Sequence, residues 1–293
     1  MKGILEKYKN QFSQVNPETL LPFVQGLAIW DIDDDPELKQ KDKVDPKKTI
    51  VTGTDISNEM AFRLLQECNI DHVIQSGRSD FFYEILASSM MLKAPDKFIK
   101  NPLPFFLKTV QEGSLDALLQ RKVKYAFTST KNKGQIVEAI DKFLTDEKRT
   151  AVFTETVLTL VNELMLNAFF DAPITPKGVH TNINMNRANI VNYPKGVTGY
   201  IHLAHDNDRL FVACEDPYGS ISFSKLKKRL YEIYVQFDTS LSGMGARLII
   251  DNSSGVYFLK QNFVKTLVCC SFPLGIGLRK SLKVPKSFHF CNY

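Results

Sequence analysis

The chain has 293 residues, of which 44% are hydrophobic and 24% are charged, and its formal net charge is +5. This is the composition of a globular protein. Apolar runs such as residues 85–87 and 248–250 are too short to span a bilayer, so no membrane segment is expected. Acidic and basic residues are interspersed along most of the chain, and charge alone therefore does not favour nucleic-acid binding.

The first seven residues carry charges where a secretory signal needs an unbroken apolar stretch. The cysteines are odd in number and include no C-x-x-C pair, which favours reduced thiols over a disulfide framework or a zinc site. They are Cys68, Cys214, Cys269, Cys270 and Cys291. We therefore expect a cytoplasmic protein that makes no contact with a membrane.

The length allows two domains. In the N-terminal part, residues 23–32, 48–53 and 72–77 predict strands, and helices are predicted at 58–67 and 80–91. This alternation is typical of a small parallel α/β domain, which we assign to residues 1–120. Three prolines interrupt the pattern after residue 94, and residues 105–119 predict a connecting helix.

The N-terminal domain resembles a truncated receiver domain. Asp31 or Asp33 follows the first predicted strand, Thr52 or Thr54 follows the second, and Gln75 stands where a receiver carries lysine. The chain before residue 49 is too short for the further strands and helices of a complete receiver, so a phosphoacceptor site is not expected. Protein contact, including dimerisation, is the function that we expect of this domain.

A second domain is predicted for residues 121–280, followed by a basic C-terminal tail at 281–293. Its long polar segment at 174–197, rich in Asn and Pro, predicts an irregular excursion. The remaining pattern predicts a mixed α/β sandwich with helices on one face of the sheet. Strands are expected at 125–128, 199–205, 209–215, 255–259 and 264–272, and helices at 134–144, 154–170, 224–237 and 243–251.

Four short motifs in this domain suggest a nucleotide site. Glu163 and Asn167 lie four residues apart on a predicted helix, so a carboxylate and an amide oxygen can reach one ligand, a suitable geometry for hydrated Mg²⁺ and its phosphates. The other three follow in order along the chain: Asp216-Pro217-Tyr218-Gly219, the glycine pair Gly243-Met244-Gly245, and Thr266 in a late strand.

Together these motifs resemble the GHKL ATP-binding fold of sensor histidine kinases and anti-sigma-factor serine kinases, over residues 124–275. The fold that this resemblance implies is a two-layer α/β sandwich of the GHKL (Bergerat) type. By the resemblance, Glu163 would be the general base and Asn167 would coordinate Mg²⁺ between the ATP phosphates.

The same resemblance implies roles for the remaining motif residues. Asp216 would accept a hydrogen bond from the adenine amino group, and Gly219 would let the backbone pass close to the base. Gly243 and Gly245 would let the chain approach the phosphates at a helix N-terminus. Thr266 would close the adenine pocket.

The resemblance implies a cytoplasmic regulatory protein that binds ATP and Mg²⁺, as a protein serine/threonine kinase acting on a protein partner. The alternative is a non-catalytic protein-interaction module with a degenerate nucleotide site. The first glycine box has one glycine where two are usual, and the second has Ala246-Arg247 where Leu-Gly is usual. Asp-Pro-Tyr-Gly is also a common turn sequence, so each motif has a structural explanation of its own.

Overall fold

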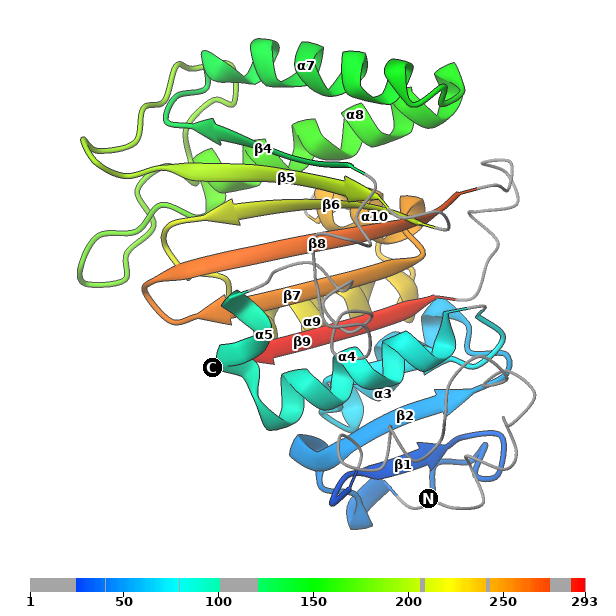
Figure 1. Ribbon diagram of the computed structural model, residues 1–293. Coiled ribbons are helices and arrows are strands. Elements are labelled where there is room, and N and C mark those ends of the chain that lie inside the picture. Colours follow the sequence, from blue (N-terminus) through cyan, green and yellow to red (C-terminus); the bar gives the residue numbers. More distant parts are fainter. Residues whose placement is uncertain are drawn as a thin grey trace. The chain divides into compact units, whose positions relative to one another are not determined.

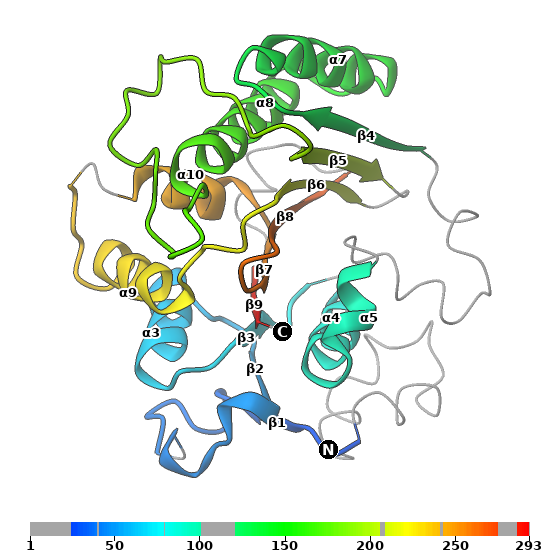
Figure 2. The ribbon, with the colours of Figure 1, turned by 90° about the vertical axis from the view of Figure 1, so that its left-hand side faces the viewer.

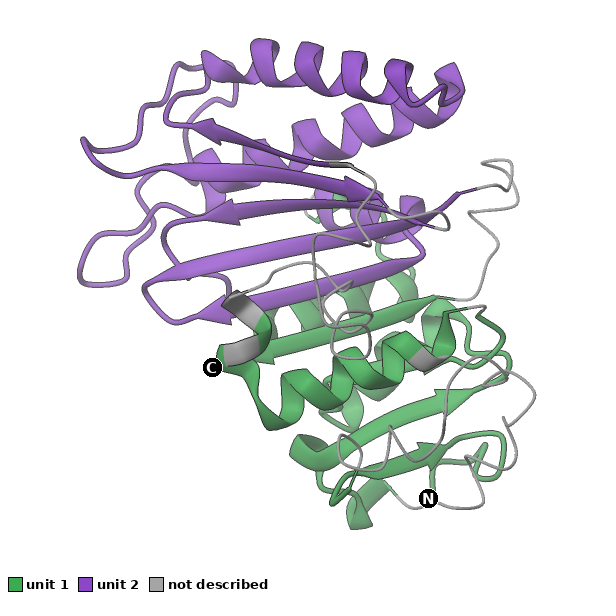
Figure 3. Ribbon diagram, viewed as in Figure 1, with its two compact units in different colours: residues 1–118, 223–244, 284–291 green, residues 119–222, 245–283, 292–293 purple. Residues whose placement is uncertain are grey.

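The computed structural model describes residues 25–39, 41–78, 80–100, 121–205, 209–240, 243–274 and 286–292. The described chain is a mixed α/β structure with parallel and antiparallel strand pairs (Figure 1). It divides into two compact units (Figure 3). Unit 1 comprises residues 1–118, 223–244 and 284–291, and unit 2 comprises residues 119–222, 245–283 and 292–293.

The strands of unit 1 confirm the predicted parallel α/β arrangement. β1 (Ala28–Asp31), β2 (Thr49–Gly53) and β3 (His72–Gln75) pair in parallel. β9 (Ser287–Asn292) then pairs antiparallel with β3. This last strand lies within the segment for which the sequence predicted a basic tail, so most of residues 287–292 belong to the fold of unit 1.

The helices of unit 1 come from two distant parts of the chain. They are α3 (Asn58–Glu67), α4 (Phe81–Lys93), α5 (Pro95–Lys100) and α9 (Phe223–Tyr234), with short 3-10 turns at Lys41–Lys43 and Pro46–Lys48. In Figure 2, α3 and α9 lie on one side of the strands and α4 lies on the other. The basic helix α9, which the sequence placed in the second domain, thus groups with unit 1. The helix predicted at 105–119 lies outside the described residues.

Aromatic packing holds these distant segments of unit 1 together. The Phe62 ring of α3 stacks on Tyr234 of α9 at 4.7 Å and lies 5.0 Å from the Phe288 ring of β9. Lys227 of α9 is buried, and its ammonium donates to Ile70 O and to Asp71 Oδ1 at 2.8 and 2.7 Å. A buried cation is tolerated because these oxygens replace its water.

Unit 2 contains an antiparallel sheet with the order β7-β8-β6-β5-β4. Its strands are β4 (Arg121–Phe127), β5 (Gly199–His205), β6 (Arg209–Asp216), β7 (Gly255–Gln261) and β8 (Lys265–Pro273). The predicted hairpin around residues 206–208 is confirmed by the pairing of β5 with β6. Most residues of β5, β6 and β8 are buried, so this sheet carries much of the core of unit 2.

Three helices accompany this sheet: α7 (Asn132–Asp146), α8 (Ala151–Leu166) and α10 (Met244–Asn252). Figure 2 shows all three on the same side of strands β4 to β8. Between β4 and β5, residues 174–197 form the predicted irregular excursion, with two isolated bridges.

Within the described ranges, no helix combines the length and the apolar character needed to cross a membrane. All five cysteines are buried free thiols.

Candidate functional site

The site is built on the last turns of α8. Thr150 caps this helix by accepting a hydrogen bond from Phe153 N at 3.3 Å. Val157, Leu160 and Leu164 are buried, while Glu163 and Asn167 are only half-buried. Residues four apart lie on the same face of a helix, and the side chains of Glu163 and Asn167 contact each other there.

After Leu166 the helix widens into one π-helical turn, Asn167–Asp171, which ends where Ala172 N donates to Asn167 O at 3.0 Å. Single π-helical turns are frequent at functional sites. This turn aligns Asp171 with Asn167 and Glu163, so the site has a second carboxylate. Burial raises the pKa of Asp171 and the Glu163 carboxylate raises it further, whereas the nearby Arg187 and His180 lower it.

The amide of Asn167 lies between the two carboxylates. Its nitrogen is 2.9 Å from Asp171 Oδ2 and 3.0 Å from Glu163 Oε1, so it donates to both. The opposite orientation would give a 3.4 Å contact between Arg187 Nη2 and Asn167 Oδ1. That orientation would also turn an amide oxygen toward two carboxylate oxygens, and we therefore assign the first.

Arg187, from the irregular segment 174–197, covers this cluster. Its Nη1 lies 3.3 Å from Glu163 Oε1, and its Nη2 lies 3.0 Å from Asp171 Oδ2. The Arg187 side chain remains 44% exposed, so solvent screens both ion pairs. Exposed pairs of this kind are worth at most about 1 kcal/mol, and other charges can replace them readily.

Gly245 of α10 packs directly against Glu163. A Cβ atom at residue 245 would overlap Glu163 Oε1 and would lie 2.7 Å from Glu163 Cδ. With Glu163 in this rotamer, the absence of a side chain at residue 245 lets the backbone of α10 approach the carboxylate this closely. Two of the sequence motifs, about eighty residues apart in the chain, therefore meet in unit 2.

Asp216 and Thr266 form a second part of the site at the ends of two paired strands. Asp216 is the last residue of β6 and lies opposite Thr266 of β8. Burial raises the pKa of Asp216 to about 6, although the hydrogen bond from Tyr218 N, at 2.9 Å, and other nearby donors lower it. The Thr266 hydroxyl is close enough to contribute to that lowering. However, it is buried and has no well-formed hydrogen bond within the described part of the chain.

Tyr193 and Ser220 connect these two parts. Tyr193 donates to Ala168 O at 2.8 Å, and its ring meets that of Tyr218 edge to face at 5.5 Å. Ser220 Oγ donates to Ala172 O at 2.6 Å. The turn that follows Asp216 is thereby fixed against the end of α8, next to Asn167.

The remaining two predicted glycines have clear structural roles. Gly219 has φ +58°, and a Cβ there would overlap Gln261 O and lie 2.9 Å from Phe263 N, so the turn packs closely on the β7–β8 hairpin. Gly243 has φ +81° and packs on Arg229 and Ile233 of α9, within unit 1. Of the seven predicted site residues, Gly243 is thus the one that lies in unit 1.

The residues that suggested a receiver domain also lie close to one another, in unit 1. The Asp33 carboxylate accepts hydrogen bonds from Thr54 Oγ1 at 2.6 Å and from Thr54 N at 3.0 Å. Ser76 Oγ lies 3.5 Å from Thr54 Oγ1. Gln75 Oε1 accepts from Lys286 N just before β9. In this arrangement Asp33 joins the loops that follow β1 and β2.

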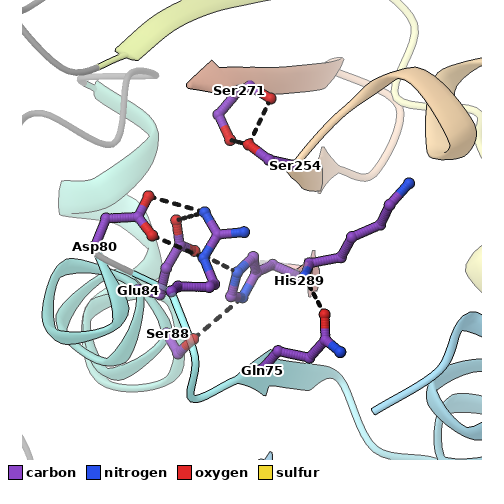
Figure 4. A network of polar contacts seen from close by, with 9 residues as sticks. Gln75, Asp80, Glu84, Ser88, Ser254, Ser271 and His289 are labelled. Carbon is purple, nitrogen blue, oxygen red and sulfur yellow. Dashed lines mark hydrogen bonds and ion pairs between the residues drawn. The ribbon is translucent and has the colours of Figure 1, made fainter. Parts of the chain in front are cut away.

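Unit 1 also contains a buried polar network that the sequence did not reveal (Figure 4). His289 Nε2 donates to Glu84 Oε2 at 2.8 Å, and His289 Nδ1 lies 3.1 Å from Ser88 Oγ. The side-chain contacts from Ser88 through His289 to Glu84 resemble the hydrogen-bonded arrangement of a Ser–His–Glu hydrolase triad. However, all three residues are at most 1% exposed, and Arg78 forms an ion pair with Glu84, so a substrate has no access and the network is structural.

A scan against protein-family models and a search of curated proteins both find no match for this chain. The site therefore rests on its residues alone. Sequence reasoning missed Asp171 and Arg187. Asp171 could have been found from the i, i+4, i+8 spacing of Glu163, Asn167 and Asp171. Nothing in the sequence pattern indicated that Arg187 returns to α8 from an irregular segment.

Proposed function

We propose that unit 2 binds ATP with Mg²⁺ in the manner of a GHKL domain, and that the protein is a cytoplasmic regulatory serine/threonine kinase acting on a protein partner. The observation that carries the proposal is the meeting of Gly245 with Glu163 beside Asn167. Three residue types suited to phosphate, metal and proton transfer then lie within one cluster.

The fold and the second part of the site support the same function. Helices on one side of an antiparallel sheet agree with the two-layer sandwich that the resemblance implies (Figure 2). A buried hydroxyl without a well-formed hydrogen bond is costly unless a ligand satisfies it. Thr266, beside the buried Asp216 carboxylate, offers such a donor and acceptor to the edge of a purine base.

In the proposed reaction, Asn167 would hold Mg²⁺, which neutralises charge on the transferring phosphate. Glu163 would accept the proton of the partner's serine or threonine hydroxyl. At the same time the hydroxyl oxygen would bond to the γ-phosphorus, and the bond between that phosphorus and the leaving oxygen of ADP would break. Asp216 and Thr266 would orient the adenine.

Asn167→Ala tests the metal role. We expect this variant to lose Mg²⁺-dependent ATP binding, measured by calorimetric titration, while its thermal unfolding temperature stays within a few degrees of the wild type. Asn162→Ala, on the same helix and also half-buried, is the matched control and should bind as the wild type does. Unchanged affinity in Asn167→Ala would contradict the metal assignment.

The second candidate function is a protein-interaction module with a degenerate nucleotide site. The observation that favours it is the role of Gly219, whose positive φ and close contact with Gln261 are explained by packing without a ligand. An absence of ATP binding by the wild-type protein, with and without Mg²⁺, would select this function.

A further inference from the structure

Arg187 lies where the proposed function needs the transferring phosphate. Its guanidinium contacts Glu163, the proposed base, and Asp171, which hydrogen-bonds the proposed metal ligand Asn167. A phosphate bridged by an ion on Asn167 and facing Glu163 would therefore come within reach of this guanidinium. We propose that Arg187 is the ligand by which the site distinguishes nucleoside triphosphates from diphosphates, moving from the carboxylates to the terminal phosphate.

The contacts of Glu163 explain why such a movement is needed. Glu163 Oε1 accepts hydrogen bonds from the Asn167 amide at 3.0 Å and from Arg187 Nη1 at 3.3 Å. Gly245 packs against the same carboxylate. An oxygen surrounded in this way has little room for the hydroxyl of an incoming substrate. When Arg187 leaves, Glu163 Oε1 can accept a hydrogen bond from the substrate hydroxyl in place of the one from Arg187. Binding of a triphosphate would therefore also make Glu163 available as the base.

The chemistry of the guanidinium and of its segment favours the exchange. Arg187 belongs to a stretch, residues 172–198, that contains Lys177, Arg187 and Lys195 and no Asp or Glu. The acidic residue nearest to Arg187 in the sequence is Asp171 of the π-helical turn, with which it already forms an ion pair. A guanidinium binds phosphate oxygens through two parallel hydrogen bonds, and a terminal phosphate carries more charge than a carboxylate. Because the Arg187 side chain is half-exposed, we expect it to reach the terminal phosphate as well as the carboxylates.

This inference rests on the proposed ATP site, and the test separates the two. The wild type, Arg187→Ala and Arg187→Lys are titrated with Mg²⁺-ATP and Mg²⁺-ADP by calorimetry. We expect Arg187→Ala to lose about tenfold or more in affinity for ATP and less than about threefold for ADP. Arg187→Lys keeps the charge without the planar fork and should recover part of the ATP affinity. Lys195→Ala, an exposed cation of the same segment, is the control and should change neither affinity.

Each outcome has one meaning. A selective loss of ATP affinity in Arg187→Ala supports the inference. Equal losses for ATP and ADP, unchanged ATP binding, or tighter ATP binding by Arg187→Ala would overturn it while leaving the ATP site in place. Failure of the wild type to bind either nucleotide would overturn both the inference and the proposed function.

Discussion

Asp216 shows how a single residue connects stability with the proposed ligand. Its carboxyl group is buried, and its pKa is about 6 against 3.8 for an exposed aspartate. The native state therefore holds a proton between pH 4 and pH 6 that the unfolded state releases. Stability from this group is complete below pH 4 and falls as the pH rises to 6, by about 3 kcal/mol in total.

Asp216→Asn removes this titration but keeps an acceptor oxygen for Tyr218 N. The free energy of unfolding, measured with denaturant at pH 4 and pH 7, should fall with rising pH by about 3 kcal/mol more in the wild type than in the variant. Parallel pH profiles for the two proteins would show that the Asp216 pKa is near its ordinary value.

At the scale of elements, the turn after β6 depends on one glycine. Gly219→Ala places a Cβ at positive φ and against the backbone of Gln261, so the turn must move away from the β7–β8 hairpin. Gly196→Ala has a similar φ, +85°, but its Cβ would meet no atom within 4 Å. Gly196→Ala therefore measures only the cost of placing an alanine at positive φ, which is about 1 kcal/mol.

We expect Gly219→Ala to lower the free energy of unfolding by at least about 2 kcal/mol more than Gly196→Ala does, because overlap with a backbone atom cannot be relieved by a side-chain rotation. Chemical denaturation of the two variants checks this difference. Equal losses would show that the turn is not constrained by the hairpin.

The individual elements were largely predictable, because their signals are local. The helix at 58–67 and the hairpin around 206–208 are confirmed, since apolar periodicity and turn residues specify them. β9 was missed because basic residues precede it and because its pairing partner, β3, is distant in the sequence. The positions of Glu163 and Asn167 followed from helical spacing, whereas the arrival of Arg187 depends on how an irregular segment folds back.

At the scale of the whole molecule, the two units should respond to acid in opposite directions. His72 in unit 1 is buried beside His289, and burial holds its pKa well below the usual 6.5. Stability from His72 is complete above pH 6.5 and is lost as the pH falls, by up to about 1.4 kcal/mol per pH unit. The contribution of Asp216 to the stability of unit 2 instead increases as the pH falls through 6.

Between pH 7 and pH 5, hydrogen exchange read by mass spectrometry should therefore report easier opening in α3 of unit 1 and stronger protection in β6 of unit 2, after correction for intrinsic rates. His72→Gln, which does not titrate, should reduce the acid response of α3 and leave that of β6 unchanged. A loss of protection of the same size in both units would argue against this assignment.

β9 also has a consequence for how the protein is made. His72 of β3 and His289 of β9 are 217 residues apart in the chain. At ordinary rates of translation, a ribosome needs roughly 10 to 40 s to cover that distance. During this time the buried Val73 and Ile74 of β3 lack their neighbouring strand, while the residues of unit 2 are being synthesised. β3 of unit 1 can therefore pair with β9 only after almost all of unit 2 has been synthesised.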